Sequence, residues 1–206
     1  MNAQILKINK KHYSSFLRNS RGSVTIEFVV VLLVLLFMLV FMADLAILRS
    51  NMGKLDNLSY SLVNVLRERT QLYGKGNESL TGTEEQKKMD INQFRQLAKG
   101  MFFGDPNSSK KLYIVLSSIE FNNAAIDQVP TEKNNITLGD IGQCKPSTNL
   151  SSMENIAPRS ELNNERTIPI YQVTVCIPSY SIFKAIIAGE ASSGRTLRSS
   201  SIAVVR

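Results

Sequence analysis

The feature that most constrains this chain is an apolar run at residues 23–43, close to its N-terminus. The run, SVTIEFVVVLLVLLFMLVFMA, contains one charged residue, Glu27, and as a helix it would extend roughly 30 Å, the thickness of a bilayer core. A helix buried in a soluble domain needs a polar face, and residues 28–43 have none. The sequence therefore predicts a transmembrane helix over residues 23–48.

Charged residues on the two sides of the run indicate its orientation. The first 22 residues contain no acidic residue and five basic ones, Lys7, Lys10, Lys11, Arg18 and Arg21. Residues 44–56, which follow the run, are of mixed sign. The positive-inside rule then predicts a cytoplasmic N-terminus and an extracytoplasmic head. A cleaved secretory signal is disfavoured, because cutting after Ala43 or Ala46 would place Phe41 or Asp44 where a small residue is required.

The net charge of the chain comes mainly from this basic leader. The formal charge is +7, and without the five leader residues the chain has 19 basic and 17 acidic residues. This near balance removes the general electrostatic argument for a nucleic-acid partner. The only histidine, His12, also lies in the leader, and the two cysteines share no short metal-binding spacing. We therefore expect no catalytic residue, no metal site and no cofactor.

A short motif lies at the cytoplasmic edge of the apolar run. Residues 21–28 read RGSVTIEF, with a glycine directly before the run and a carboxylate five residues after that glycine. This arrangement resembles the cleavage site of type IV prepilins. It is most similar to the short form in tight-adherence (Flp, type IVc) pilus proteins of the TadE and TadF kind. The resemblance is specific over residues 18–48, and the length, the single span and the cysteine-containing head are most similar to TadF.

This resemblance implies a role in pilus assembly. A TadF-like minor pilin or pseudopilin would be cut between Gly22 and Ser23 by a prepilin peptidase, which removes a leader of residues 1–22. Its other partners would be further pilins or pseudopilins, the inner-membrane pilus assembly machinery and the lipid bilayer. Such a protein is a single-pass protein of the bacterial inner membrane with a periplasmic head. It would serve a Flp or type IV-like pilus used in adherence, without enzymatic activity.

The residue types of the motif suit this role. Gly22 has no side chain, so a membrane-embedded peptidase can approach its backbone closely. Cutting after Gly22 would leave a free amine on Ser23, four residues from the carboxylate of Glu27. A charge costs roughly 2.5–3.5 kcal/mol at the centre of a span, so a partner is implied. In pilins that partner is usually the free amine of a neighbouring subunit, and the pair sets the register between subunits. The alternative is that Glu27 only snorkels to the headgroups.

The rest of the chain has the pattern of a small α+β head over residues 74–206. Apolar residues continue at spacings of three and four beyond the span, which predicts that the helix extends over residues 49–73. The same stripe would arise if this extension packed only on its own head. Turn-forming residues predict a loop at residues 74–83, and a helix is expected at residues 84–101.

Strands are expected in the second half of the chain, in an antiparallel sheet. Residues 112–121 form a β-rich run, and residues 171–177 alternate in the manner of a half-buried strand. A short final strand is predicted at residues 201–205. The segment between the first two strands, residues 122–167, is rich in Asn, Ser, Pro and Thr and is expected to be an irregular loop. Residues 182–188 suggest a further short helix.

The two cysteines, Cys144 and Cys176, are predicted to lie outside the cytosol, so a disulfide between them is the favoured interpretation. The bond would tie the long loop to the sheet and stabilise the head by roughly 3–4 kcal/mol. The alternative is a pair of free thiols.

Two other functions fit the same layout. The first is a single-pass signal-anchored envelope protein whose extracytoplasmic head acts on or binds a ligand. No convincing serine-nucleophile motif supports a catalytic head. The second is a eukaryotic type II membrane glycoprotein, since five asparagines head Asn-x-Ser/Thr triplets, although an Asn- and Ser-rich chain produces these by chance.

Overall fold

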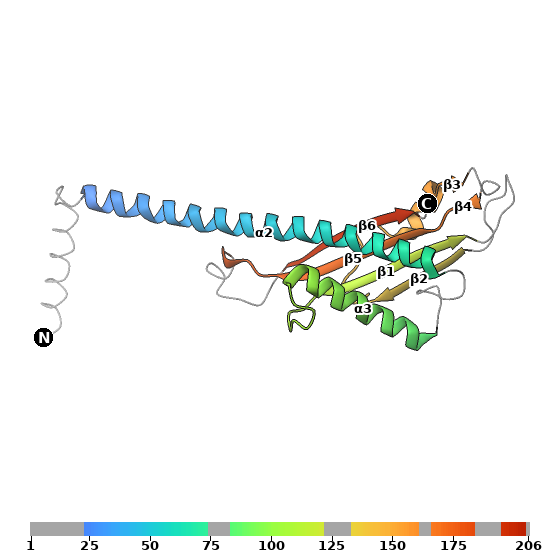
Figure 1. Ribbon diagram of the computed structural model, residues 1–206. Coiled ribbons are helices and arrows are strands. Elements are labelled where there is room, and N and C mark those ends of the chain that lie inside the picture. The colour runs from blue at the N-terminus through green and yellow to red at the C-terminus, as the bar shows by residue number, and fades with distance from the viewer. Residues whose placement is uncertain (1–22, 74–82, 122–132, 161–165, 184–194, 205–206) are drawn as a thin grey trace, which may run out of the picture. The chain divides into compact units, whose positions relative to one another are not determined.

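The computed structural model describes residues 23–73, 83–121, 133–160, 166–183 and 195–204. The chain forms two compact units, Met1–Ala46 and Ile47–Arg206, and the second of these is the head. A long helix and an antiparallel sheet make the protein α+β, so the predicted fold class is confirmed (Figure 1).

Helix α2 (Ser23–Tyr73) supplies both the apolar segment and the first element of the head. Between Val24 and Met42 most of its large apolar side chains are exposed, and its most apolar stretch is not buried within the protein. By length and composition it is able to cross a membrane. The helix therefore fits a membrane-anchored single-pass protein.

The head contains a four-stranded antiparallel sheet with the strand order β2-β1-β5-β6. The strands are β1 (Tyr113–Phe121), β2 (Lys133–Gly139), β5 (Ile170–Ser179) and β6 (Arg195–Val204). The register places Tyr113 of β1 opposite Cys176 of β5, and Ser179 of β5 opposite Arg195 of β6. The start of β1, the end of β5 and the start of β6 therefore lie at the same end of the sheet.

Helix α3 (Glu84–Phe103) begins and ends at defined caps. The side chain of Thr83 accepts a hydrogen bond from the backbone N–H of Gln86, and the side chain of Gln86 accepts one from the N–H of Thr83. At the other end Gly104 is left-handed, with φ 78°, and its N–H donates to the carbonyl of Gly100. The predicted helix at residues 84–101 is thus present and slightly longer.

The main hydrophobic core lies between the sheet and the two helices, which cover the same face of the sheet (Figure 1). The stripe of apolar residues on α2 points into this core, and alternate residues of β1 and β5 meet it. The buried members are Leu55, Leu58, Leu62, Val63, Leu66, Phe94, Ala98, Leu112, Ile114, Leu116, Tyr171, Val173, Val175, Ile177 and Leu197.

One polar residue, Ser59, interrupts the stripe of α2 and is nevertheless buried. Its hydroxyl oxygen lies 2.9 Å from that of Ser199 and 2.7 Å from that of Ser201, both on β6. The three small side chains satisfy one another's hydrogen-bonding groups inside the core. The interruption in the stripe therefore marks the contact between α2 and β6.

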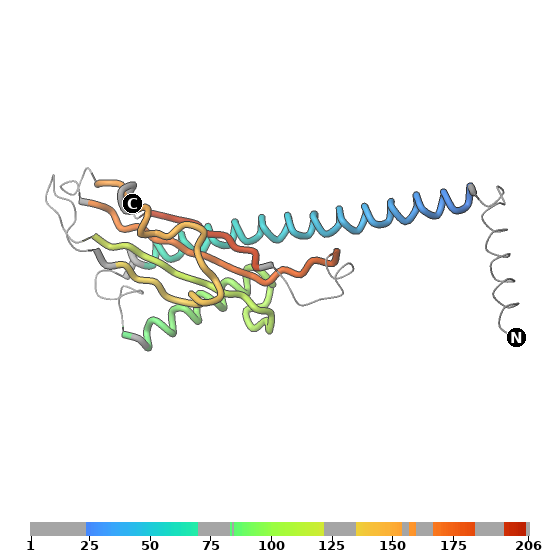
Figure 2. Tube along the Cα trace, turned by 180° about the vertical axis from the view of Figure 1, so that it is seen from behind, coloured from blue at the N-terminus to red at the C-terminus, as the bar shows by residue number. Residues whose placement is uncertain are grey.

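The opposite face of the sheet is also covered. The segment that follows β2 crosses this face (Figure 2). Its Cys144 packs beside Val115 and Cys176, and its Leu150 packs beside Ile119 and Ile170. The strand predicted at residues 171–177 is therefore present as part of β5, but its predicted half-burial is wrong, because β5 is buried on both faces.

Two polar side chains of β5, those of Gln172 and Thr174, form hydrogen bonds within this covered face. Gln172 donates a hydrogen bond from its Nε2 to the carbonyl of Thr148 at 3.0 Å. The hydroxyls of Thr174 and Ser200 lie 2.9 Å apart. Polar residues at alternate positions of a strand indicate a solvent-facing side only if no other segment packs on that side. In this protein the segment that follows β2 packs there.

Residues 122–167, which were expected to be irregular, contain regular elements. β2 pairs with β1 from Val115 opposite Gly139 to Phe121 opposite Lys133. The first residues of β2, Lys-Asn-Asn, have low strand propensity, and pairing at the edge of the sheet overrides it. After β2 come a short 3₁₀ helix, η2 (Leu150–Ile156), and a two-stranded ribbon of β3 (Arg159–Ser160) and β4 (Arg166–Thr167).

Two other predicted elements lie partly outside the described residues, and a third is longer than predicted. Of the loop expected at residues 74–83, only Thr83 is described. Of the helix expected at residues 182–188, Ile182 and Phe183 are described and are helical. The last strand, β6, is longer than the predicted strand at residues 201–205 because it pairs with the whole of β5.

Candidate functional site

Two of the predicted processing and register residues, Ser23 and Glu27, belong to the start of α2. Gly22 lies outside the described residues, and Ser23 is the first residue of the helix. Glu27 follows one helical turn later, so these two positions lie on the same face. The side chain of Glu27 is exposed among exposed apolar residues such as Val24 and Phe28. A carboxylate on a helix of this composition needs a cationic partner in the membrane or a path to the headgroups.

The predicted disulfide between Cys144 and Cys176 is present in the head, with the two Cα atoms 5.6 Å apart. Cys176 belongs to β5, and Cys144 belongs to the segment that covers the sheet. Both are buried beside Val115, and Tyr113 packs against them. The bond therefore fastens the covering segment to β5, one of the two central strands of the sheet.

Removing this disulfide is expected to lower the free energy of unfolding of the head by about 3 kcal/mol, because the unfolded chain regains the freedom of the closed loop. Denaturant unfolding of the full chain in detergent would compare the oxidised protein with a Cys144→Ala/Cys176→Ala variant. Ser151→Ala, an exposed change on the same segment, is the control and should leave the midpoint unchanged. Equal midpoints for all three proteins, or full alkylation of both cysteines without reductant, would contradict the expectation.

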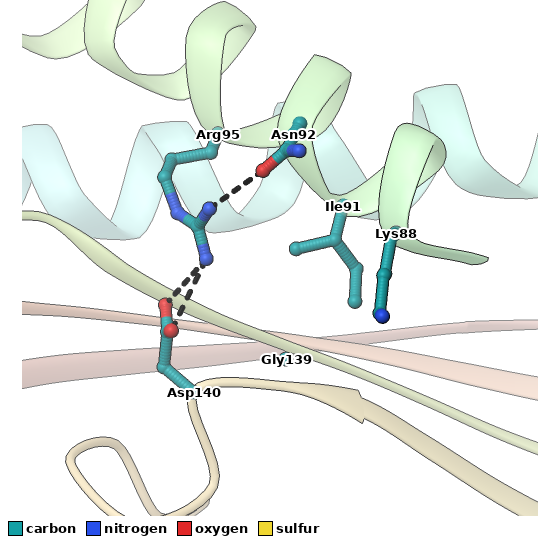
Figure 3. Close-up of a pocket in the computed structure, with 6 residues that line it drawn as sticks. All are labelled: Lys88, Ile91, Asn92, Arg95, Gly139 and Asp140. Carbon is teal, nitrogen blue, oxygen red and sulfur yellow. Dashed lines mark hydrogen bonds and ion pairs between the residues drawn. The ribbon is translucent and has the colours of Figure 1, made fainter. Parts of the chain in front are cut away.

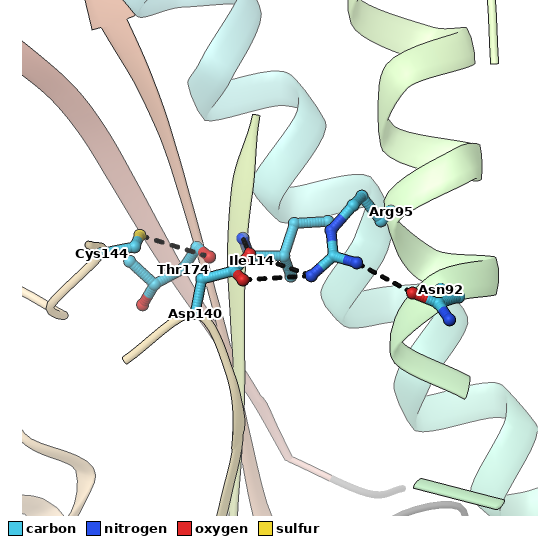
Figure 4. A network of polar contacts seen from close by, with 6 residues as sticks. All are labelled: Asn92, Arg95, Ile114, Asp140, Cys144 and Thr174. Carbon is cyan, nitrogen blue, oxygen red and sulfur yellow. Dashed lines mark hydrogen bonds and ion pairs between the residues drawn. The ribbon is translucent and has the colours of Figure 1, made fainter. Parts of the chain in front are cut away.

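Asp140, directly after β2, connects several elements of the head (Figure 4). Its carboxylate accepts two hydrogen bonds from Arg95 of α3, both at 3.1 Å, and one from the backbone N–H of Ile114 at 3.2 Å. Its own N–H donates to the carbonyl of Ile114 at 2.9 Å, and its carbonyl accepts from the N–H of Cys144 at 2.9 Å. One residue thus links α3, β1 and the turn that leads to the disulfide.

The residue before it, Gly139, has a backbone that only glycine adopts readily. Its φ is 116°, and a Cβ at this position would collide with the carbonyl oxygen of Ile114. The absence of a side chain lets the end of β2 lie against β1, which brings Asp140 to Arg95 and Ile114. Gly139 is therefore required by the geometry of the Asp140 contacts.

The same residues line a shallow pocket of about 270 Å³ between α3 and the end of β2 (Figure 3). Besides Gly139 and Asp140 its lining includes Lys88, Ile91, Asn92 and Arg95. The guanidinium of Arg95 is occupied on both sides, by Asp140 and by the side-chain oxygen of Asn92 at 2.8 Å. The ion pair between Arg95 and Asp140 within this lining links α3 to the end of β2.

The sequence interpretation missed Arg95, Gly139 and Asp140. A Gly-Asp pair after the alternating residues Ile136, Thr137 and Leu138 was the available signal, since such pairs often end a strand. Across the parts of the chain that the structure describes, no group of three or more His, Cys, Asp or Glu side chains is placed to hold a metal ion. The predicted N-terminal residues and the predicted disulfide belong to different units.

Comparison with protein families gives a match over nearly the whole chain. The model of the TadF family, described as "Putative tight adherence pilin protein F", matches residues 15–206. The match includes the motif at residues 21–28, the long helix and the head. Comparisons with curated proteins and with solved structures give no significant match.

Proposed function

Since this chain belongs to the TadF family of tight-adherence pilins, we propose that it is a minor pilin or pseudopilin, processed by a prepilin peptidase and needed to assemble a Flp or type IV-like pilus. The observation that carries the proposal is the match over residues 15–206, which joins the cleavage motif to a long apolar helix in one chain. The role is structural: the protein contributes a helix and a head to an assembly and catalyses no reaction.

Processing is the first step of the proposed function. The basic leader would hold residues 1–22 in the cytoplasm, and the peptidase would cut between Gly22 and Ser23 at the membrane surface. The single-pass chain would then keep its head in the periplasm of the bacterial envelope. An oxidising periplasm is the compartment in which a disulfide such as Cys144–Cys176 persists, which supports this orientation.

Assembly is the second step. The new amine of Ser23 in one subunit would pair with Glu27 of its neighbour, as the position of both residues on one helix face allows. Glu27 is surrounded by exposed apolar side chains, so packing of such helices side by side would remove the pair from water. A pair of this kind sets register more than it adds stability.

Substitution of Gly22 by phenylalanine is expected to stop processing, because a bulky side chain obstructs close approach to the backbone at the cut. Intact-mass measurement on membrane-extracted protein should show the wild type beginning at Ser23 and Gly22→Phe retaining the leader. Asn19→Phe, which adds the same side chain within the leader, is the control and should still be cut.

The mature N-terminus also separates the alternatives. A wild-type protein that keeps its leader would favour a signal-anchored envelope protein whose head binds a ligand. A mature form that begins beyond Ala43 would indicate a secreted protein. Either result would contradict the proposed processing.

A further inference from the structure

One end of the head exposes a group of apolar and basic residues that the proposed function does not use. Lys110 and Lys111 lie just before β1, and Tyr180 and Ile182 lie just after β5. The register of the sheet places the start of β1 and the end of β5 together. Met101 lies in the last turn of α3, shortly before the start of β1 in the chain. We call Met101, Lys110, Lys111, Tyr180 and Ile182 the proximal surface.

This end of the head is also the end at which α2 enters it. Arg69, near the end of α2, forms a 2.8 Å ion pair with Asp90, near the start of α3. The two helices therefore run in opposite directions, and the end of α3 lies beside the earlier part of α2 (Figure 1). Leu48 of α2 and Phe102 and Phe103 of α3 are partly buried, and all three pack against the same core cluster.

The chain itself connects the proximal surface to the membrane segment. The head begins at Ile47, and the apolar run ends at Ala43. Four residues of helix correspond to about 6 Å, so the first residue of the head lies within a short distance of the bilayer surface. The chain connection therefore keeps this end of the head within reach of the headgroup region once the span is inserted.

The composition of the proximal surface suits an interface between lipid and water. Tyr180 is 66% exposed, and Met101 and Ile182 are about half exposed. Tyrosine and apolar side chains are favoured at the headgroup level, and lysines there attract anionic lipids. Lys110 lies 5.3 Å from the centre of the Phe103 ring, which places its charge beside an aromatic side chain. Asp105 is the acidic residue of the same loop, and the two adjacent lysines outweigh it.

We propose that the proximal surface docks on the anionic surface of the bilayer that anchors the protein. The inference rests on the proposed membrane anchoring and adds a second contact between the protein and the lipid. Tyr180, Ile182 and Met101 enter the headgroup region, and Lys110 and Lys111 contact lipid phosphates. The head is thereby held against the membrane until the subunit is assembled.

A single tryptophan tests the contact, because the chain contains none. Full chain carrying Tyr180→Trp is reconstituted into phosphatidylcholine–phosphatidylglycerol vesicles with and without bromine on the acyl chains. Bromine should quench the emission of this variant. Met89→Trp is the matched control, since Met89 is 63% exposed near the opposite end of α3, and its emission should be unaffected.

Charge reversal tests the role of the lysines. Adding Lys110→Glu and Lys111→Glu to Tyr180→Trp should lower the ratio of docked to undocked heads by at least about tenfold, since each lysine near an anionic surface is worth roughly 1 kcal/mol. Quenching should fall accordingly, and it should also fall in vesicles of phosphatidylcholine alone.

Flotation of the vesicles separates docking from anchoring. Protein that floats with the vesicles but shows no quenching of Tyr180→Trp, or equal quenching of both tryptophans, overturns the docking and leaves the anchoring intact. A change in Tyr180→Trp emission that follows protein density and not bromine would indicate a protein partner and also overturns it. Protein that does not float contradicts both proposals.

Discussion

Gly139→Ala is expected to lower the free energy of unfolding of the head by about 3 kcal/mol or more. A non-glycine residue at φ 116° is strained, which costs roughly 1–3 kcal/mol, and the new Cβ has to push the Ile114 carbonyl away at a similar cost. The shift would also draw Asp140 away from Arg95 and from the N–H of Ile114. Denaturant unfolding of the detergent-solubilised full chain, followed by near-UV circular dichroism, measures the loss.

Gly142→Ala is a closely matched control for this change. Gly142 lies three residues further along the same turn, and a Cβ built there meets no atom within 4 Å. Its unfolding midpoint should stay within the usual range for surface substitutions, about 0.5 kcal/mol. Similar losses for the two variants would show that the collision with Ile114 does not limit the stability of the head.

Glu27→Ala is expected to abolish most fibre formation while leaving insertion and processing intact. The variant keeps Gly22 and the apolar run, and a span with one charge fewer enters the bilayer at least as well. Removing one partner from a buried ion pair costs about 3–5 kcal/mol, so incorporation into the fibre should fall by more than tenfold. Cleavage state, membrane level and fibre production would be measured together in cells whose only copy is the variant.

Two further variants test whether the expected loss of fibre formation comes from the missing charge of Glu27. Glu27→Gln keeps the size of the side chain and removes its charge, so it should resemble Glu27→Ala if pairing with an amine is the reason for the loss. Thr25→Ala changes an exposed neighbour on the same helix and should give normal fibres. Normal fibres from a correctly cleaved Glu27→Ala protein would remove the register role and support simple snorkelling to the headgroups.

Those features of the fold that depend on local pattern were predictable from the sequence. The apolar run and the stripe beyond it gave α2, and the capping residues Thr83 and Gln86 lie where the second helix was expected to begin. The disulfide followed from the compartment, because two cysteines outside the cytosol tend to pair. The TadF resemblance rested on residues 18–48 and on the length, single span and cysteine-containing head of the chain, and the family match confirms it.

The features that were missed depend on contacts between distant segments. β2 has a polar start and becomes a strand only because β1 offers an edge to pair with. Arg95 and Asp140 are separated by 45 residues, so no local spacing joins them. The burial of Gln172 depends on a covering segment that has no regular pattern of its own.

The contact between α2 and β6 determines when the head can become stable. Ser59 and Ser199 are 140 residues apart, and Leu197 completes the same core as Leu55 and Leu62. During synthesis α2 leaves the ribosome well before β6, the strand that contacts it. A fold whose core joins the two ends of the chain closes late, because distant segments have to meet before their contacts stabilise it. Leu55 and Leu62 therefore stay open to water and proteases until β6 completes the core.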